Sequence, residues 1–218
     1  MLEFRTRYKK KEVIIALGSE SAGNFCIFKD GKIYHHNGFG NLLDSKNYSN
    51  FSNSIYSILE KDKLKPAVIL ADKHPLFLSS LLAEDIAKKY KAKLIKVQHH
   101  VAHIFAALGE DELINKKKIQ NKIVGIACDG TGYGDDESIW GGEVIAIDLK
   151  NKDYKRAGFL EPQILLGGEQ AIRQPARMLI GILAKFLNKE KIYEIVKNII
   201  GKTSSNYYLI KLSKDLIA

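Results

Sequence analysis

The stretch Ile123-Val-Gly-Ile-Ala-Cys128, followed by Asp129-Gly-Thr-Gly-Tyr-Gly134, decides the fold of this chain. Its first half is a short apolar run rich in β-branched residues, which is typical of a buried strand, and its second half is a loop of small and polar residues. A returning strand is predicted over 139–147 and a third strand over 154–159, with a turn at 151–153. The segment therefore predicts an antiparallel sheet.

The same plan occurs earlier in the chain. Val13-Ile-Ile-Ala-Leu17 reads as a strand, residues 18–24 as a turn of small polar residues, and residues 25–36 as a hairpin with Asp30-Gly31 at its bend. Asp-Gly between alternating runs is a strong hairpin signal. A repeated strand, glycine-containing turn and hairpin is the pattern of an α/β fold of the actin-like or ribonuclease-H-like (ASKHA) type, with a mixed sheet. In such folds the two turns face each other across a cleft.

The remaining apolar periodicity predicts the elements between and after these two units. Helices are expected over 51–60, 76–90, 99–108, 171–187, 191–200 and 207–216, and strands over 67–71 and 93–97. The charged segment 109–122 has no apolar period and is expected to be a linker. We predict one lobe over 1–120 and a second over 121–218, incomplete because no strand pair follows residue 159.

Composition limits the class of protein. The chain has 218 residues, of which 45% are hydrophobic and 27% charged, so it can form a core and is not expected to be disordered. No stretch approaches the roughly 18 apolar residues of a membrane span, and the N-terminus does not resemble a secretory signal. Cys26 and Cys128 stand in separate apolar runs, so both are expected in the core and no disulfide framework is indicated. These features favour the cytoplasm.

The formal net charge of +9 favours anionic partners in general. The lysines occur in short runs, at 9–11, 88–89 and 116–118, without the interleaved aromatic residues that stack on bases. The runs are therefore interpreted as solvated faces, and the pattern argues against a nucleic-acid interface.

The clearest chemical signal is Lys96-Val-Gln-His-His-Val-Ala-His103. His99 and His103 are four residues apart on a predicted helix that follows a strand, which puts both imidazoles on one helical face within reach of one metal ion. His100 points about 100° away and is the less favoured ligand. The alternative is a pair of hydrogen-bonded histidines without a metal.

The loop after Cys128 carries the second signal. Asp129, at the end of the predicted strand, could bind a cation directly or through water. The spacing does not fit a dinucleotide-binding fingerprint, but glycine amides allow a phosphate to approach closely. A plain hairpin turn is the alternative. The predicted phosphate-binding residues are Gly18, Ser19, Gly130, Thr131, Gly132, Tyr133, Gly134, Gly141 and Gly142.

Arg173 and Arg177 are four residues apart, so on one helical face they could bind an anion, although exposed arginines at this spacing are commonly solvated. No nucleophile motif such as G-x-S-x-G and no Walker A loop is present, so no catalytic residue is assigned.

Taken together, the motifs resemble the TsaD-like domain of HypF, the carbamoyltransferase family of hydrogenase maturation. The resemblance covers about residues 13–180. The segments that carry it are Ala16-Leu-Gly18 with Phe25-Cys26, Asp72-Lys-His-Pro75, Val97-Gln-His-His-Val-Ala-His103, Asp129-Gly-Thr-Gly-Tyr-Gly134, Ile139-Trp-Gly-Gly-Glu143, and Gly167-Gly168 with Ala171-Ile-Arg173, Pro175 and Arg177-Met178.

The resemblance implies a nucleotide-binding fold that delivers a carbamoyl group to the C-terminal cysteine of a HypE-like acceptor. The donor would be carbamoyl-adenylate, made from carbamoyl phosphate and ATP in another domain. His99 and His103 would hold a divalent metal (Mg, Zn or Fe), with Asp129 as a further ligand or as a group next to the ligands. Residues 18–24 depart from the family's first glycine loop, because the lysine and asparagine of that loop are not at the matching positions. Half of the second lobe is expected to be absent too, so a second chain could complete the domain.

Three other functions stay open. A relative of the tRNA threonylcarbamoyl transferases shares the His-x-x-x-His helix, but the stretch Trp140-Gly-Gly-Glu143 has no place in that family. A carbamoyltransferase acting on a small molecule would use the same domain. A non-catalytic binding module would keep only the fold and a partner surface.

Overall fold

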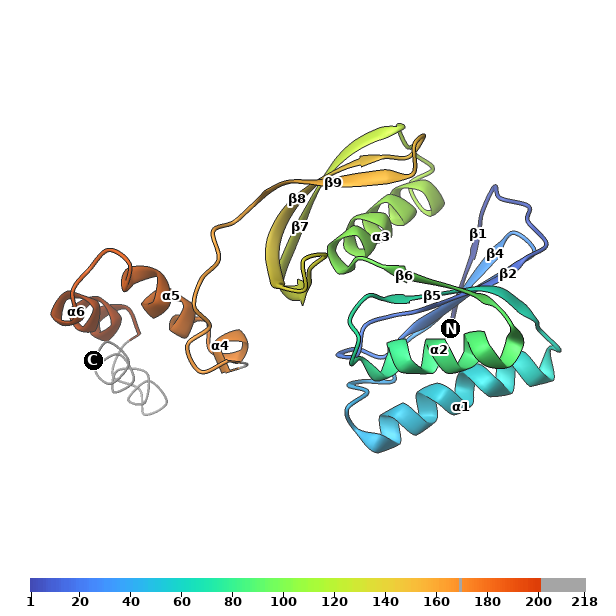
Figure 1. Cartoon of the computed structure of the whole chain (residues 1–218), viewed down its shortest axis with the longest axis horizontal. Helices are drawn as coiled ribbons and strands as arrows, with labels where there is room; N and C mark the ends of the chain where they lie inside the picture. Colours follow the sequence, from blue (N-terminus) through green and yellow to red (C-terminus); the bar gives the residue numbers. More distant parts are fainter. Residues whose placement is uncertain (169, 201–218) are drawn as a thin grey trace. The chain divides into compact units, whose positions relative to one another are not determined.

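The computed structural model of the chain describes residues 1–168 and 170–200. These residues fall into two compact units, one over Met1–Phe159 and one that starts at Leu160 (Figure 1). The first unit contains the strands β1 to β9 and the helices α1 to α3. All the residues of the candidate site described below lie in this first unit.

A six-stranded mixed sheet forms the base of the first unit. Its members are β1 (Leu2–Arg5), β2 (Val13–Leu17), β3 (Phe25–Lys29), β4 (Lys32–His36), β5 (Pro66–Asp72) and β6 (Lys93–Val97), in the order β1-β4-β3-β2-β5-β6. The predicted hairpin at Asp30-Gly31 is confirmed, and both bend residues have positive φ. Strands β2, β5 and β6 are parallel, so their carboxyl ends meet at one edge of the sheet, which is where α/β folds hold ligands.

Two helices cover one face of this sheet, α1 (Ser45–Lys61) and α2 (Leu78–Tyr90) (Figure 1). Phe25, Phe51, Ile55, Ile69 and Ile86 are among the fully buried side chains between sheet and helices. α1 starts six residues before the predicted helix. The reason is a side-chain cap, because the Asp44 carboxylate accepts the backbone N–H groups of the first turn.

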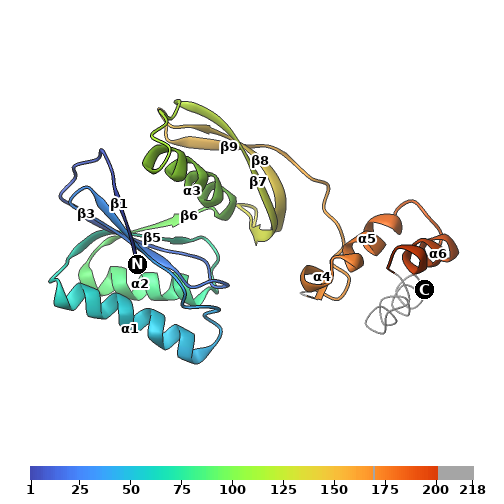
Figure 2. The same cartoon turned by 180° about the vertical axis from the view of Figure 1, so that it is seen from behind.

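The second sheet is antiparallel, as predicted, and consists of β7 (Lys122–Tyr133), β8 (Ile139–Asp148) and β9 (Asp153–Phe159) in that order. Helix α3 (His99–Leu113) packs along it, as both views show (Figures 1 and 2). Val101 and Ile104 from α3 meet Ile145 and Ile147 from β8 in a separate small core. α3 continues five residues beyond the predicted end, so the first part of the expected linker is helical.

The predicted loop over 129–134 is wrong in its conformation. Residues 129–133 are extended and belong to β7, whose register with β8 shifts between Cys128 and Gly132. A shift of this kind inserts unpaired residues and bends the strand, which here turns Asp129 toward α3. The turn that joins β7 to β8 comes later, at residues 134–138. Cys128 is exposed rather than buried, because it lies on the outer face of the sheet.

The second unit is helical in its described part, with α4 (Gln170–Arg173), α5 (Ala176–Leu183) and α6 (Lys189–Ile200). The sequence pattern predicts a single helix over 171–187, and this is wrong. Pro175 separates α4 from α5, because proline restricts the residue before it and lacks the N–H that a helix interior needs. The predicted helix over 207–216 lies outside the described residues. In the described part of the chain, no helix has the length and apolar character needed to cross a membrane.

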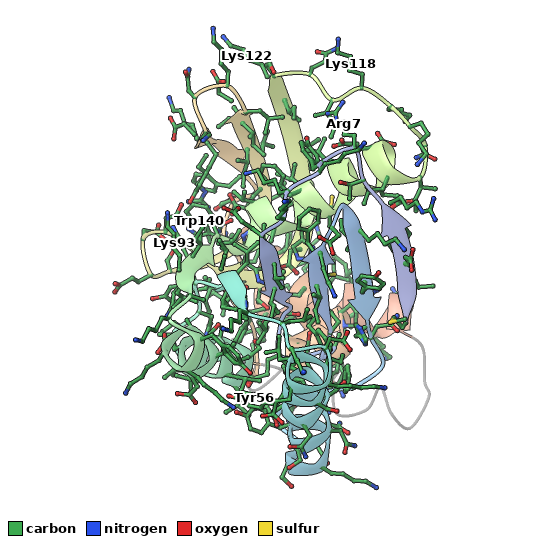
Figure 3. All side chains as sticks on the ribbon, turned by 90° about the vertical axis from the view of Figure 1, so that its right-hand side faces the viewer. Arg7, Tyr56, Lys93, Lys118, Lys122 and Trp140 are labelled. Carbon is green, nitrogen blue, oxygen red and sulfur yellow. The ribbon has the colours of Figure 1, made fainter. Side chains whose placement is uncertain are left out.

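The boundary between the compact units, at 159/160, differs from the predicted lobe boundary at 120/121. The predicted boundary falls instead between the two sheets of the first unit, so the division into lobes stays a prediction. The lysines at 9–11, 88–89 and 116–118 are all exposed, which agrees with solvated faces. Arg7 and Lys118 line one hollow of about 470 Å³ at the surface, and Arg7 pairs with Glu112 there (Figure 3).

Candidate metal centre

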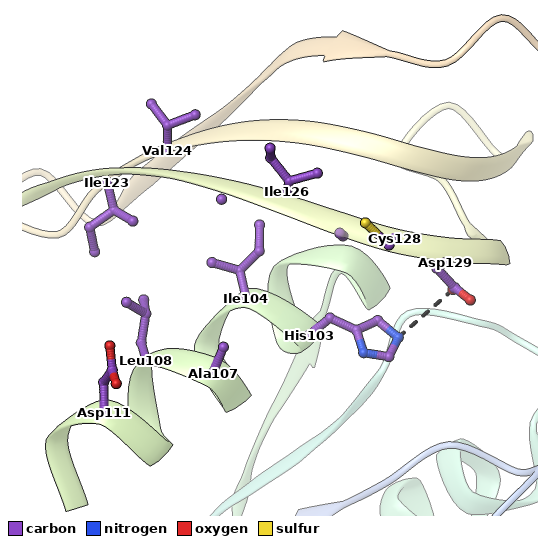
Figure 4. Close-up of a pocket in the computed structure, with 12 residues that line it drawn as sticks. His103, Ile104, Ala107, Leu108, Asp111, Ile123, Val124, Ile126, Cys128 and Asp129 are labelled. Atoms are coloured by element: carbon purple, nitrogen blue, oxygen red, sulfur yellow. Dashed lines mark ion pairs between the residues drawn. The ribbon is translucent and has the colours of Figure 1, made fainter. Parts of the chain in front are cut away.

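Three predicted residues converge in the structure. His99 and His103 lie one turn apart in the first half of α3, and Asp129 lies in the bent part of β7. The His99 Nε2 atom is 3.3 Å from His103 Nε2 and 3.1 Å from Asp129 Oδ2. His103 Nε2 is 3.8 Å from the same oxygen, and Figure 4 shows this pair. One potential ligand atom from each residue lies within 4.8 Å of the other two. The arrangement thus agrees with the spacing argument.

Local sequence explains why the two imidazoles point to the same place. β6 ends at Val97, and Gln98 caps α3 because its side-chain oxygen accepts the Val101 N–H at 2.9 Å. The helix therefore starts directly at the carboxyl end of a parallel strand, with His99 as its first residue. A spacing of four residues then places His103 above His99 on the same face.

His99 has a second partner that spacing did not predict. Its Nδ1 atom lies 2.6 Å from Oδ2 of Asp72, the last residue of β5. Asp72 belongs to a motif that supported the family resemblance but had no assigned role. The sequence did contain a signal for Asp72. It is an acidic residue that directly follows a predicted strand, as Asp129 is, and such strand ends are where α/β folds hold ligands.

His100 is closer to the site than predicted. It is fully buried, and its Nε2 atom lies 3.8 Å from Asp129 Oδ2. The Gln98 amide nitrogen donates to His100 Nδ1 at 3.1 Å and to the Tyr133 carbonyl at 3.2 Å, so the proton of the neutral imidazole is on Nε2. Burial lowers the pKa of His100, which favours this neutral form. His100 therefore turns an N–H group toward Asp129.

A glycine makes this close approach possible. A Cβ atom built on Gly132 would lie 2.6 Å from Cε1 of His100 and 2.7 Å from Cδ2 of His99. Neither distance is compatible with a real contact between carbon atoms. β7 can lie against the first turn of α3 only because position 132 has no side chain.

The electrostatics of the cluster favour a positive charge on His99 and a negative charge on Asp129. Interactions with Asp129 and then with Asp72 raise the pKa of His99 to about 9, against the opposing effect of burial. Burial works to raise the pKa of Asp129, but the interaction with His99 and the hydrogen bond from the Gly130 N–H outweigh it and lower that pKa. In the metal-free protein at neutral pH, His99 is therefore an imidazolium between two carboxylates.

The donor set fits a divalent cation. The Asp129 Oδ2 atom is buried and accepts no well-aligned hydrogen bond, although three imidazoles lie within 3.8 Å of it. Buried carboxylate oxygens without aligned donors are rare, and they commonly mark an ion. Two imidazole nitrogens and a carboxylate oxygen are a common ligand set for zinc and iron, and less suited to magnesium alone.

The raised pKa of His99 predicts a dependence of stability on pH in the metal-free protein. The unfolded imidazole has a pKa of 6.5, so the stabilisation is complete below this value and is lost as the pH rises through about 9. We expect the free energy of unfolding to fall by up to about 3 kcal/mol between these values. Urea denaturation of the EDTA-treated chain at several pH values measures this free energy of unfolding. The variant His99→Gln should lack this component, and equal pH profiles for both proteins would contradict the prediction.

The predicted phosphate-binding residues occupy three places. Gly18 and Ser19 follow β2 and line a hollow of about 680 Å³ together with Asp72, His99 and His103. Gly130, Thr131, Gly132, Tyr133 and Gly134 lie in β7 or directly after it, and Gly141 and Gly142 lie in the neighbouring strand β8. The backbone of both glycine-containing segments, 18–24 and 129–134, therefore comes near His99. Phosphate binding itself stays a prediction.

The two arginines do not share a helical face, so that prediction is wrong. Arg173 ends α4 and Arg177 lies in α5, because Pro175 interrupts the helix. Arg177 is buried and donates to the Gln174 side chain at 2.7 Å, which gives it a structural partner. Both residues are in the second unit.

A further polar cluster connects the two sheets. The Lys73 ammonium group contacts a carboxylate oxygen of Asp135, and the Tyr154 hydroxyl donates to the other oxygen at 2.8 Å. Lys73 directly follows Asp72, whereas Asp135 belongs to the turn after β7. The cluster therefore joins the strand end that carries Asp72 to the strand that carries Asp129.

Comparison with known proteins identifies relatives of this chain. One family model, described as "HypF Kae1-like domain", matches residues 9–110, and a second, described as "Carbamoyltransferase, Kae1-like Domain, second subdomain", matches residues 125–216. The probable carbamoyltransferase HypF of Methanocaldococcus jannaschii is 36% identical over 81% of this chain and 22% of its own length. Carbamoyltransferase HypF of Synechocystis is 34% identical over 78% of this chain and 21% of its own length.

Solved structures of HypF proteins have a fold similar to that of this chain. A full-length HypF in the phosphate- and nucleotide-bound form superposes with a TM-score of 0.72 at 26% identity, over 99% of this chain and 27% of that one. HypF of T. kodakarensis gives a TM-score of 0.73 at 28% identity, over 99% and 28%. These matches confirm the predicted actin-like, ASKHA-type fold. The chain spans about a fifth of the length of these curated relatives.

Proposed function

The chain belongs to the family of HypF carbamoyltransferases, and we propose that its Kae1-like domain carries out the transfer step of ATP-dependent carbamoylation. The donor is carbamoyl-adenylate, and the acceptor is the thiol of a C-terminal cysteine in a HypE-like protein. The observation that carries this proposal is the convergence of His99, His103 and Asp129 beside the two glycine-containing segments. A HypF relative solved with phosphate and nucleotide supports the assignment of a nucleotide to this fold.

Two histidines and one aspartate would hold the cation, through Nε2 of His99, Nε2 of His103 and Oδ2 of Asp129. A divalent cation held there would supply positive charge that stabilises the phosphate of the leaving nucleotide. In the transfer the thiolate sulfur forms a bond to the carbamoyl carbon. The bond from that carbon to the phosphate oxygen breaks, and AMP leaves with the electron pair.

The chain's own groups orient the reactants. Gly130 and Gly141 carry no side chain, and a Cβ atom added at Gly130 would meet nothing within 4 Å, so the space beside Gly130 is open to a phosphate. The hollow of about 680 Å³ opens at the ends of β2, β5 and β6, and Leu17 and Phe105 add apolar surface to it. A site of this kind admits an apolar peptide end and limits the access of water to the acyl group.

The metal proposal predicts that His103→Ala weakens cation binding by at least about 100-fold, because one of three protein ligands is lost. Titration of the EDTA-treated chain with Co²⁺, followed by visible absorption, measures the affinity. His35→Ala is the matched control, since His35 lies in β4, away from the three ligands, and its loss should leave binding unchanged. Equal Co²⁺ affinities for His103→Ala and the unaltered chain would contradict the proposal.

The acceptor is tested by supplying ATP and carbamoyl phosphate, the HypF domains that make carbamoyl-adenylate, and one acceptor at a time. Carbamoyl transfer to a HypE-like protein supports the proposal. Transfer to a small molecule, or tRNA binding with a steep salt dependence, would indicate one of the other two enzyme classes. Cation binding without transfer to any acceptor would indicate a binding module.

The strand β7 also presents an exposed apolar surface. β7 is an edge strand of its sheet, and its outward side chains Val124 and Ile126 are 69% and 70% exposed. A hollow of about 290 Å³ runs between this edge and α3, from Asp111 to the site at Asp129 (Figure 4). Exposed apolar patches commonly mark contact surfaces in proteins. We propose that a further segment of polypeptide covers this face of β7. A cytoplasmic location stays a prediction.

A further inference from the structure

We propose that Asp72 is a positioning residue that keeps the proton of the His99 imidazole on Nδ1, so that Nε2 presents its lone pair to His103 and Asp129. The inference deepens the proposed function and rests on the cation site assigned there. It adds the residue that makes one of the ligand atoms available.

The contact between the two side chains is short and protected. Asp72 Oδ2 lies 2.6 Å from His99 Nδ1, and the Asp72 side chain is only 8% exposed. The other carboxylate oxygen, Oδ1, already accepts the His74 backbone N–H at 2.8 Å. An ionised carboxylate has no proton to give, so the hydrogen bond exists only when His99 donates from Nδ1. The neutral imidazole then has no proton on Nε2.

Asp72 is itself held in place. It ends β5, where it pairs with Val97 of β6, and its carbonyl oxygen accepts the Ser80 hydroxyl at 3.0 Å. The next residue, Lys73, donates its backbone N–H to the Val97 carbonyl at 3.0 Å. Two strands and a helix therefore fix the backbone of Asp72, and the hydrogen bond from the His74 N–H orients its carboxylate. Such preorganisation is what orients the ligands of metal sites.

The two histidines differ in this respect. The His103 side chain is 56% exposed, so water competes for its outer nitrogen, whereas the His99 side chain is 14% exposed and held by Asp72. With its proton on Nδ1, His99 places an unprotonated Nε2 at 3.3 Å from His103 Nε2 and at 3.1 Å from a carboxylate oxygen. Lone pairs at these distances repel one another unless a proton or a cation lies between them. A cation bound at Nε2 would take the place of the proton that this atom carries in the imidazolium, while Asp72 keeps the other proton on Nδ1.

The substitution Asp72→Asn tests the inference, because it keeps the shape and reverses one hydrogen bond. If the amide oxygen keeps the His74 N–H, the amide NH₂ group faces His99 Nδ1. That nitrogen must then accept, and the proton moves to Nε2. Asp85→Asn, on the exposed side of α2, is the matched control that removes a carboxylate without touching the site.

The tautomer is measured directly by two-bond ¹H–¹⁵N correlation spectra of the ¹⁵N-histidine-labelled, metal-free chain. The spectra are recorded over a range of pH, and the tautomer is read where the His99 imidazole carries a single proton. We expect the His99 proton on Nδ1 in the unaltered chain and in Asp85→Asn, and on Nε2 in Asp72→Asn. A proton on Nε2 in the unaltered chain overturns the inference without any variant. An unchanged tautomer in Asp72→Asn overturns it as well.

Titration with Co²⁺ separates this inference from the proposed function. Loss of a hydrogen bond that orients a ligand is expected to weaken Co²⁺ binding by about 10- to 100-fold in Asp72→Asn. An unaltered chain that has the predicted tautomer but binds no Co²⁺ would refute the metal proposal and leave the role of Asp72 in place. Normal Co²⁺ binding together with an unchanged tautomer in Asp72→Asn would refute the role of Asp72 alone.

Discussion

Gly132→Ala is expected to lower the affinity for Co²⁺ by about 100-fold, because the new methyl group would overlap both His99 and His100. The Cβ atom would lie 2.6 Å from a ring carbon of His100 and 2.7 Å from one of His99. His100 is fully buried and the His99 side chain is 14% exposed, so neither ring can move aside freely. The rings must therefore tilt, or β7 must move away from α3 and take Asp129 with it.

The same strand contains the matched control. A Cβ atom added at Gly130 would have nothing within 4 Å, so Gly130→Ala adds the same methyl group without a collision. Both variants should retain the circular dichroism spectrum of the unaltered chain, since overpacking at one position costs about 1–3 kcal/mol. Co²⁺ titration distinguishes them. If Gly132→Ala binds the ion as tightly as Gly130→Ala does, the close approach of β7 is not what shapes the site.

Arg156→Met is expected to have the largest effect on stability, with a loss of about 3–5 kcal/mol. Arg156 in β9 makes two hydrogen bonds to the Glu143 carboxylate in β8, Nε to Oε2 at 2.6 Å and Nη2 to Oε1 at 2.7 Å. The Glu143 side chain is 1% exposed, so the substitution leaves a buried carboxylate without its counter-charge. The guanidinium also lies over the rings of Trp140 and Phe159, and these contacts are lost too.

Urea denaturation measures this loss, and Trp140 is a convenient reporter because it is the single tryptophan of the chain and lies next to Arg156. Lys32→Ala is the matched control. Lys32 in β4 pairs with Glu3 in β1 across neighbouring strands, but both side chains are exposed, so its loss should cost less than about 1 kcal/mol. A loss below about 1 kcal/mol for Arg156→Met would show that the Glu143 carboxylate does not depend on its partner.

The elements that could be predicted were those with a strong local signal. The strand over 13–17 and the Asp30-Gly31 hairpin follow from a β-branched run and a turn dipeptide, and both are confirmed. Some errors were local, such as the break at Pro175, and others occurred where a distant contact decided the conformation. β1 is a short charged segment that becomes a strand only through pairing with β4. The glycine-rich stretch 129–133 is extended, and its last two residues, Gly132 and Tyr133, pair with β8 after the shift in register.

The amino-acid sequence alone determined that His99 and His103 share a helical face at the end of a strand, since that relation depends only on the geometry of one helical turn. It also indicated Asp129 as a candidate ligand from its place after an apolar run. The roles of Asp72, His100 and Gly132 were decided only by the tertiary structure. These residues come from three separate elements, and spacing along a chain does not encode which atoms of separate elements come within hydrogen-bonding distance. Packing of β5, α3 and the bent strand β7 brings them together, and the chemistry of the site depends on that packing.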